Sequence, residues 1–403
     1  MLNILAFIQV SSAFIGICPF IYYWFKMNRK SKQPIEIPPQ PIIWPSLTIV
    51  LPLWNEEIVL LKKLEDLEEQ QYPSDKIELL VIDSNSTDST LSILDEWQLN
   101  RKSKFKVSVV KMNERKGKSA AINLILQQEI YSDALVITDA DALLAPNSLK
   151  RIGRWMSDEK IGAVCGTQKI IDSTTTEHLL NEMTYRRFYH DLRIGESSIS
   201  STPIFEGSLA SYRNSLILGK QIDSTYNADD SQLAILAHRS GGRSIMDSQL
   251  TFFESLPTSR KSARNRKLRR ANGLVHLFSR NNAKDLDPKF AKIFRNEARA
   301  HLLMPFFVMI SVFSMLCHFT LSTYYLWLNS NIDDSHIFLL MLDSTIFLLL
   351  LVGNQFQLGR VLRSFIISQW ILFLANIERY SGKDRRYWDQ DIESRKLIAN
   401  GLD

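Results

Sequence analysis

The stretch "ALVITDADALLAPNSLKRI", residues 134–152, joins a short apolar run to two aspartates separated by one alanine. Residues 135–137 (Leu-Val-Ile) predict a strand, because a short apolar run with polar flanks is typical of a strand buried on both faces. Asp139 and Asp141 follow at the carboxyl end of that run, and the residues after them predict the start of a helix. The stretch therefore predicts a strand, an acidic turn and a helix in succession.

The same alternation extends over the middle of the chain. Apolar runs predict five strands, at residues 47–53, 77–83, 106–110, 134–140 and 161–167. Apolar residues at helical spacing lie between these runs. Repeated strand–helix units of this length predict an α/β fold with a mostly parallel sheet and helices on both faces. In such sheets ligands bind beyond the carboxyl ends of the strands, which is where Asp83 and Asp139 stand.

Four segments are apolar enough to meet a membrane, at residues 3–25, 302–328, 337–352 and 361–377. The first carries no charge and is long enough to cross a bilayer, which needs ~20 residues. A cleaved signal peptide is the alternative, but no Lys or Arg precedes Phe25, and residues 22–24 (Tyr-Tyr-Trp) are typical of a membrane interface. We therefore expect an N-terminal anchor that is retained.

Basic residues predict the orientation of these segments. Four Lys or Arg residues follow the first segment within residues 26–32, so the positive-inside rule places the middle of the chain in the cytoplasm. Residues 329–336 contain acids but no Lys or Arg, which is typical of an outer loop, whereas the tail after residue 378 is basic. This pattern favours two crossings within 301–357 and an interfacial segment at 358–378; a third crossing there is the alternative.

The resulting division of the chain has seven parts. We expect a transmembrane helix (1–25), a Pro-rich basic linker (26–46), an α/β domain (47–255), a basic amphipathic interfacial region (256–300), two transmembrane helices (301–357), an interfacial or third membrane helix (358–378) and a cytoplasmic tail (379–403). With 45% hydrophobic and 23% charged residues, the chain is too charged for a purely membrane-embedded protein.

The net charge and the cysteines indicate the kind of partner and the compartment of the protein. The formal net charge of +5 is local, because seven Lys or Arg residues crowd residues 260–270. Their position just before a membrane segment favours anionic lipid or phosphates over nucleic acid as the partner. Cys18, Cys165 and Cys317 have no spacing typical of a metal site and suit a reducing compartment.

Asp139 and Asp141 are two residues apart, so their side chains leave the same face of an extended chain. Two such carboxylates repel each other unless a cation lies beside them. Oxygen ligands at a loop suit Mg²⁺ or Mn²⁺, which then bridge to substrate phosphates. The alternative is a solvated turn in which one acid caps the following helix.

Further polar residues follow the neighbouring strands. Pro52, Trp54 and Glu56 stand at the end of the first strand, and Asp83 ends the second beside polar residues suited to a base or ribose. Lys118 precedes a predicted helix, where anions are favoured. Its Gly-Lys-Ser context is no Walker loop, because position 112 is Met where the first glycine would stand.

In order and spacing, four motifs resemble those of the family-2 inverting glycosyltransferases with the GT-A fold: "LPLWNEE" (51–57), "LLVIDSNSTDST" (79–90), "GKSAAIN" (117–123) and "VITDADA" (136–142). The resemblance covers residues 47–278, and the flanking apolar segments are similar to the membrane-bound, synthase-like branch. It implies a Rossmann-like, mostly parallel sheet. It also implies that Asp83, with Glu56, contacts the nucleoside, and that Asp139 and Asp141 hold the diphosphate and a Mg²⁺ or Mn²⁺ ion.

The segment "NADDSQLAILAHRSG" (227–241) resembles the region that carries the catalytic base of the family, which places the base at Asp230 with Asp229 beside it on the acceptor side. The alternative is an acidic helix N-terminus favoured by the helix dipole. A base is needed because inverting transfer removes the proton of an acceptor hydroxyl as it attacks the sugar. Residues 202–217 are expected to form the acceptor wall, with Glu206 and Gly207 lining it.

The segment "RKLRR" (266–270) stands where processive members of the family have Gln-x-x-Arg-Trp. Arg269 keeps the arginine, whereas Arg266 replaces the glutamine and Arg270 replaces the tryptophan. Arginines suit a pyrophosphate, but the missing tryptophan removes a stacking platform for a sugar and disfavours a long-polymer synthase. A basic amphipathic helix on anionic lipid is the alternative.

These features predict a multi-pass glycosyltransferase of the cell membrane whose catalytic domain faces the cytoplasm. Its donor would be a UDP- or GDP-sugar and its acceptor a lipid-linked sugar or glycan, with no nucleic-acid partner. Three alternatives stay open: a polyprenyl-phosphate glycosyl synthase, a polysaccharide synthase, and a non-catalytic membrane adaptor that binds a nucleotide.

Overall fold

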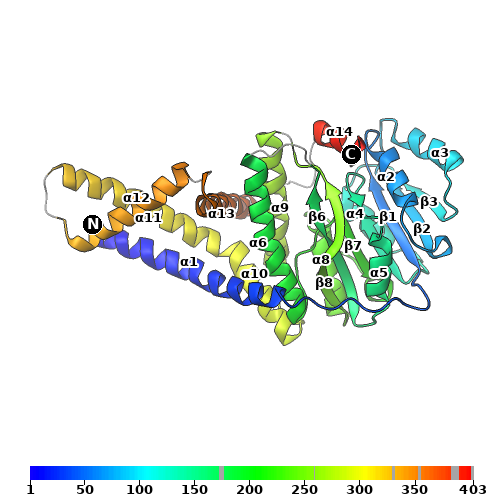
Figure 1. The fold of residues 1–403 in the computed structure, drawn as a ribbon, viewed down its shortest axis with the longest axis horizontal. Helices are drawn as coiled ribbons and strands as arrows, with labels where there is room; N and C mark the ends of the chain where they lie inside the picture. Colours follow the sequence, from blue (N-terminus) through cyan, green and yellow to red (C-terminus); the bar gives the residue numbers. More distant parts are fainter. Residues whose placement is uncertain (172–176, 258, 329–331, 353–354, 383–389, 401–403) are drawn as a thin grey trace.

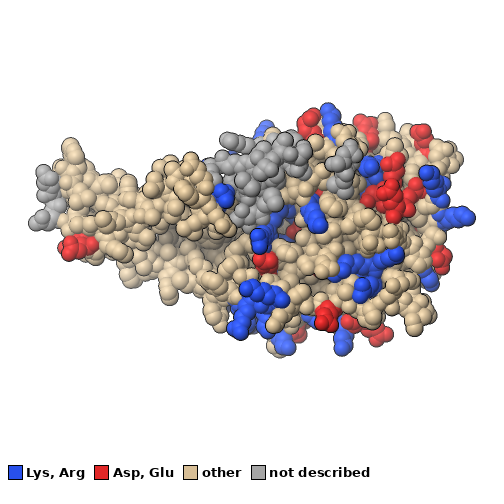
Figure 2. Space-filling model, in the orientation of Figure 1, with Lys and Arg blue, Asp and Glu red and all other residues tan. Residues whose placement is uncertain are grey.

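The computed structural model describes residues 1–171, 177–257, 259–328, 332–352, 355–382 and 390–400. It contains an α/β domain built on one sheet and a stalk of long apolar helices that extends from it (Figure 1). Figure 2 shows, on one face, Lys, Arg, Asp and Glu gathered on the α/β domain, whereas the stalk carries almost no charge. The distribution of charge thus follows the two parts of the fold.

The sheet has eight strands in the order β3-β2-β1-β4-β7-β6-β8-β5. The first half is parallel and is formed by β1 (Leu47–Leu53), β2 (Ile77–Asp83), β3 (Lys106–Lys111) and β4 (Ala134–Thr138). The second half contains β5 (Leu143–Leu144), β6 (Ile161–Ile170), β7 (Leu209–Arg213) and β8 (Arg243–Glu254). β7 runs antiparallel to both β4 and β6, and β6 pairs parallel to β8. The predicted mostly parallel α/β sheet is confirmed.

Alternate residues of the central strands enter two separate cores, because successive side chains of a strand point to opposite faces. Ile49 and Leu51 belong to one core and Val50 to the other. The first core is covered by α2 (Leu60–Glu68), α3 (Thr90–Asn100) and α5 (Ser148–Met156). The second is covered by α4 (Lys118–Leu126), α7 (Asn214–Ile217) and α8 (Asp229–Arg239). Burial on both faces explains the fully apolar strands.

Among the residues that the structure describes, four helical segments are long and apolar enough to cross a membrane. They are α1 (Leu2–Ser31), the continuous pair α10 (Pro288–Leu302) and α11 (Met304–Trp327), α12 (Asp334–Val352) and α13 (Gln357–Ser381). Residues 26–31, expected at the start of the linker, continue α1 as helix. Figure 1 shows α1, α11 and α12 along the stalk, whereas α13 is strongly foreshortened and runs across its base.

Two helices join the stalk to the sheet, α6 (Glu177–Ile199) and α9 (Arg260–Arg280) (Figure 1). α6 crosses α1 so closely that a Cβ atom on Gly195 would lie 2.1 Å from the backbone oxygen of Met27. Only glycine permits this approach of two helix backbones. The apolar face of α9 packs against α13 through Leu268, Val275 and their neighbours. The α/β domain is thereby joined directly to the apolar helices of the stalk.

Candidate active site

A cavity of about 1340 Å³ opens at the carboxyl ends of β1 and β4 and extends between α6, α8, α9 and α13. Its wall contains thirteen of the fourteen residues singled out from the sequence: Pro52, Trp54, Glu56, Lys118, Asp139, Asp141, Glu206, Gly207, Asp229, Asp230, Arg266, Arg269 and Arg270. Asp83 is absent from the wall formed by the described residues. Motifs that lie almost 220 residues apart in the chain therefore meet around one space.

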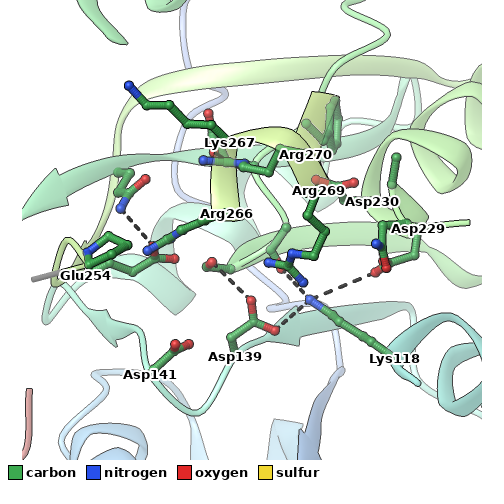
Figure 3. Close-up of a pocket in the computed structure, with 18 of the residues that line it drawn as sticks. Lys118, Asp139, Asp141, Asp229, Asp230, Glu254, Arg266, Lys267, Arg269 and Arg270 are labelled. Carbon is green, nitrogen blue, oxygen red and sulfur yellow. Dashed lines mark hydrogen bonds and ion pairs between the residues drawn. The ribbon is translucent and has the colours of Figure 1, made fainter. Parts of the chain in front are cut away.

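Lys118 lies at the centre of the acidic part of this cavity (Figure 3). It follows Gly117, whose φ of 85° starts α4. The ammonium donates to Asp139 Oδ1 (2.6 Å) and to the carbonyl oxygen of Gly207 (3.0 Å), and it lies 3.9 Å from Asp229 Oδ2. One cation thus links the acids at the end of β4 to the acids at the start of α8.

The charges of this cluster stabilise one another. Burial raises the pKa of Asp139, but Lys118 and a hydrogen bond from Ser208 (3.1 Å) lower it by more, so the net pKa of Asp139 is lowered. Burial lowers the pKa of Lys118, and Asp139 with Asp229 more than offsets this effect, so its pKa is raised. Asp139 is therefore ionised but largely engaged by the protein itself.

Asp141 is the more available of the two carboxylates, since 38% of its side chain is exposed. Among the residues that the structure describes, no group of three His, Cys, Asp or Glu side chains is arranged to hold a metal ion. Mg²⁺ commonly binds through one or two carboxylates together with substrate phosphates. The oxygen donors present fit such a shared site, with Asp141 as the primary ligand and Asp139 beside it.

Asp229 and Asp230 open α8 directly after Ala228, a non-glycine residue with a φ of 97°. Gly207 approaches Asp230 so closely that an added Cβ atom would lie 3.1 Å from Asp230 Oδ2. Burial and the neighbouring charge of Asp229 raise the pKa of Asp230 to about 7, although Lys118 and the Ser231 amide oppose the shift. A carboxylate with this pKa is a suitable general base near neutral pH.

The three arginines of α9 point into the cavity, and two of them pair with buried acids (Figure 3). Arg266 contacts Glu254 at 2.5 Å, and Arg270 contacts Glu206 at 2.5 Å. Burial and the adjacent charges of Arg266 and Arg270 lower the pKa of Arg269 to about 10. Arg269 concentrates positive charge opposite Asp139, so it is well placed to contact an anion there.

Glu206 lines the cavity, and two arginines hold its carboxylate there. Its carboxylate accepts from Arg193 of α6 and from Arg270 of α9. Burial raises the pKa of Glu206, but the two arginines lower it by more, so the net pKa lies well below the ordinary range. Glu206 therefore ties α6 to α9 across the cavity wall.

The end of β1 forms the opposite side of the cavity. The guanidinium of Arg115 lies over the Trp54 ring, 3.3 Å from its centroid, which is a cation–π geometry. Glu56 is buried, and its amide donates to Thr90 Oγ1 at 2.7 Å. Asp83 lies behind Ser84 and accepts from the Ser86 amide at 3.1 Å, so it orders the loop after β2.

Residues that the sequence did not single out complete the wall. They include Arg115, Arg193 and, from the C-terminal helix α14 (Ile392–Ala399), Arg395. Arg115 could be found from its position two residues before Gly117. Arg395 lies 339 residues from its partner Glu56, and nothing local in the sequence links the two.

The cavity also extends to α13, one of the long apolar helices. Ile371 and Leu372 of α13 and Leu274 of α9 line it on that side. Among the described residues, the wall contains twelve Lys or Arg and eight Asp or Glu side chains, whereas α13 contributes Ser368, Ile371 and Leu372, none of them charged. This arrangement connects the acidic site to the base of the stalk.

The sheet and the helices that cover it form a GT-A-type fold, as found in glycosyltransferases. The chain belongs to glycosyl transferase family group 2, whose model matches residues 134–356, and the glycosyl transferase family 2 model matches residues 48–218. The mannosyltransferase PcManGT from Pyrobaculum calidifontis, solved with GDP-Man and Mn²⁺, is 27% identical in sequence. The two structures superpose with a TM-score of 0.77 over 94% of this chain and all of that one.

Relatives of known description match over shorter stretches. A probable glycosyltransferase of Bacillus subtilis, YdaM, is 31% identical over 139 residues, 33% of this chain and 31% of that protein. The β-monoglucosyldiacylglycerol synthase of Synechocystis is 31% identical over 137 residues, 32% of this chain and 28% of that enzyme. The poly-β-1,6-N-acetyl-D-glucosamine synthase of Staphylococcus epidermidis is 21% identical over 53% of this chain and 51% of that enzyme. The matched part thus spans about a third to a half of their lengths.

Proposed function

We propose that the protein is a membrane-anchored, inverting hexosyltransferase that uses a UDP- or GDP-sugar and a membrane-associated acceptor. The observation that carries this proposal is the single cavity in which Asp139, Asp141 and Asp230 face one another and whose wall continues to α13. Similarity to a mannosyltransferase solved with GDP-Man and Mn²⁺ supports a nucleotide-sugar donor and a divalent metal. A glycolipid synthase and a polysaccharide synthase among the relatives support a lipid or glycan acceptor.

In the proposed reaction, the acceptor hydroxyl attacks the anomeric carbon of the donor while the bond to the diphosphate breaks. Asp230 accepts the hydroxyl proton, and its raised pKa makes it a stronger base than an exposed aspartate. Arg269 and Lys118 lie where they stabilise the negative charge of the departing diphosphate. A Mg²⁺ or Mn²⁺ ion at Asp141 would add to that stabilisation.

The acceptor would reach the cavity along α13. The outer face of α13 carries exposed Val361, Ile367, Trp370 and Ile377, and its inner face packs on α9. An amphipathic helix of this kind suits the membrane interface. With α1, α11 and α12 as the crossings, the basic residues after α1 favour a cytoplasmic catalytic domain.

The test is a transfer assay with purified protein in lipid nanodiscs. Labelled UDP-glucose, UDP-N-acetylglucosamine and GDP-mannose are supplied with Mn²⁺ and an extract of membrane lipids, and the organic phase is analysed for label. We expect one donor to label a lipid-soluble product whose new linkage, determined by NMR, has the inverted anomeric configuration. Retained configuration would contradict the proposed single displacement.

A further inference from the structure

We propose that α14 is part of the donor site and that Arg395 is a positioning residue that holds Glu56 for its contact with the nucleoside. The inference rests on the proposed function, because it assumes that the cavity binds a nucleotide. It adds an element from the far end of the chain that none of the donor-site motifs contains. Four features of α14 carry it.

The first feature is the contact itself. Arg395 is only 6% exposed, and its guanidinium donates through both terminal nitrogens to the two carboxylate oxygens of Glu56. One of these nitrogens also lies 3.8 Å from Asp141 Oδ2. A bidentate pair of this kind fixes both the position and the orientation of a carboxylate. Arg395 therefore couples Glu56 at the end of β1 to the acidic turn after β4.

The second feature is a further bond to the same loop. Gln390 Nε2 donates to the carbonyl oxygen of Trp54 at 2.8 Å and lies 3.3 Å from Glu56 Oε1. The segment that leads into α14 thus holds the backbone of residue 54 as well as the side chain of residue 56. Both residues line the side of the cavity assigned to the nucleoside.

The third feature is that α14 is anchored independently of this contact. Ile398 is 2% exposed and joins the core that α2 and α3 cover. Asp391 caps the helix by accepting from the Ser394 amide at 3.1 Å. Ile398 is not part of the cavity wall formed by the described residues, so the packing of Ile398 holds α14, and with it Arg395, by a contact that does not involve Glu56.

The fourth feature is the balance of charge. Asp139 and Asp141 line one side of a cavity that would accept a diphosphate, and like charges repel it. Lys118 compensates Asp139, and Arg395 compensates Glu56 while facing Asp141. Without Arg395, the buried carboxyl group of Glu56 would lose its charged partner beside the proposed nucleotide site.

The chain offers a matched control one residue away. The side chain of Lys396 is 59% exposed and pairs with Glu393 on the surface of α14, outside the cavity wall. Lys396→Gln removes one positive charge from the same helix without touching Glu56. Comparing Arg395→Gln with Lys396→Gln shows whether a change in nucleotide binding depends on the contact with Glu56 or only on the net charge of α14.

The experiment is isothermal titration of UDP and GDP, in Mn²⁺, into the full-length protein in nanodiscs. Wild type, Arg395→Gln, Glu56→Gln, the double variant and Lys396→Gln are compared. We expect the Kd of the bound nucleotide to rise about tenfold or more in Arg395→Gln and also to rise in Glu56→Gln. The Kd of the double variant should be no higher than that of the single variant that binds more weakly. Lys396→Gln should keep the wild-type Kd.

An unchanged Kd in Arg395→Gln overturns the inference. So do additive losses in the double variant, because a general loosening of α14 would add to the loss of Glu56, whereas a positioning role acts only through it. Failure of the proposed function looks different: wild type itself would bind neither nucleotide.

Discussion

Asp230 owes its proposed role to its neighbours more than to its own chemistry. Burial and the charge of Asp229 raise its pKa, while Lys118 opposes that shift. A Cβ atom on Gly207 would lie 3.1 Å from Asp230 Oδ2, so the glycine leaves this side of the carboxylate uncrowded. The same aspartate on an exposed helix would be a weaker base by several powers of ten in proton affinity.

The raised pKa of Asp230 predicts a pH dependence. A general base works only when it is ionised, and ionisation of Asp230 is half complete at a pH of about 7. We therefore expect kcat/KM for transfer to rise with pH through about 7 and to fall about tenfold per unit below it. Initial rates between pH 5.5 and 8.5 provide the measurement, with donor binding followed in parallel as the control. A rate independent of pH across this range would contradict the role of Asp230.

For single residues, the sequence indicated where the acids of the cavity lie in the fold but not which residues pair with them. Asp139, Asp141 and Asp230 stand at strand ends or a helix start, and that local signal is visible in the chain. The engagement of Glu206 by Arg193 and Arg270, and of Glu56 by Arg395, depends on residues brought together only by folding. The sequence suggested Glu206 as an acceptor contact but gave no sign that two arginines would hold its carboxylate in the cavity wall.

The helix α9 connects the cavity to the apolar helices, because its two faces contact different parts of the molecule. It carries Arg266, Arg269 and Arg270 on one face and Leu268 and Val275 on the other. The arginine-bearing face lines the cavity, and the apolar face packs on α13. The basic run that suggested a helix lying on lipid is thus directed in large part at the active site, and α13 lies between α9 and the stalk.

The stalk helices are joined by a buried polar network. Asp343 of α12 accepts from Gln9 of α1 at 2.7 Å and contacts His318 of α11 at 3.0 Å, and His318 contacts His336 at 3.2 Å. Polar groups inside an apolar bundle must find partners within it. The network therefore fixes the register of the three helices.

Asp343→Leu tests this network. The substitution leaves Gln9 and His318 without their partner, so we expect a loss of roughly 1–3 kcal/mol in the free energy of unfolding. The measurement is reversible unfolding in mixed detergent micelles. Ser344→Ala is the control, because its hydroxyl bonds only to Leu340 of its own helix. Equal stability of the two variants would show that the network is dispensable.

In the whole molecule, the acidic turn after β4 and the apolar helix α13 line the same cavity. The sequence predicted the architecture because periodicity and apolar length are properties of single elements. It did not predict that α14 returns to β1, since the two segments are separated by more than 330 residues and share no pattern. The parallel pairing of β1 to β4 followed from short strand–helix units, but the antiparallel insertion of β7 did not.

The most direct test of the central claim separates nucleotide binding from transfer in the same protein. Wild type, Asp141→Asn and Asp230→Asn are compared in nanodiscs with the active donor and Mn²⁺. We expect Asp141→Asn to lose both metal-dependent nucleotide binding and transfer. Asp230→Asn should bind the nucleotide as wild type does but transfer the sugar about 10²–10⁴ times more slowly. Transfer at the wild-type rate in Asp230→Asn would contradict a general base at this position and would favour an acceptor that is already an anionic phosphate.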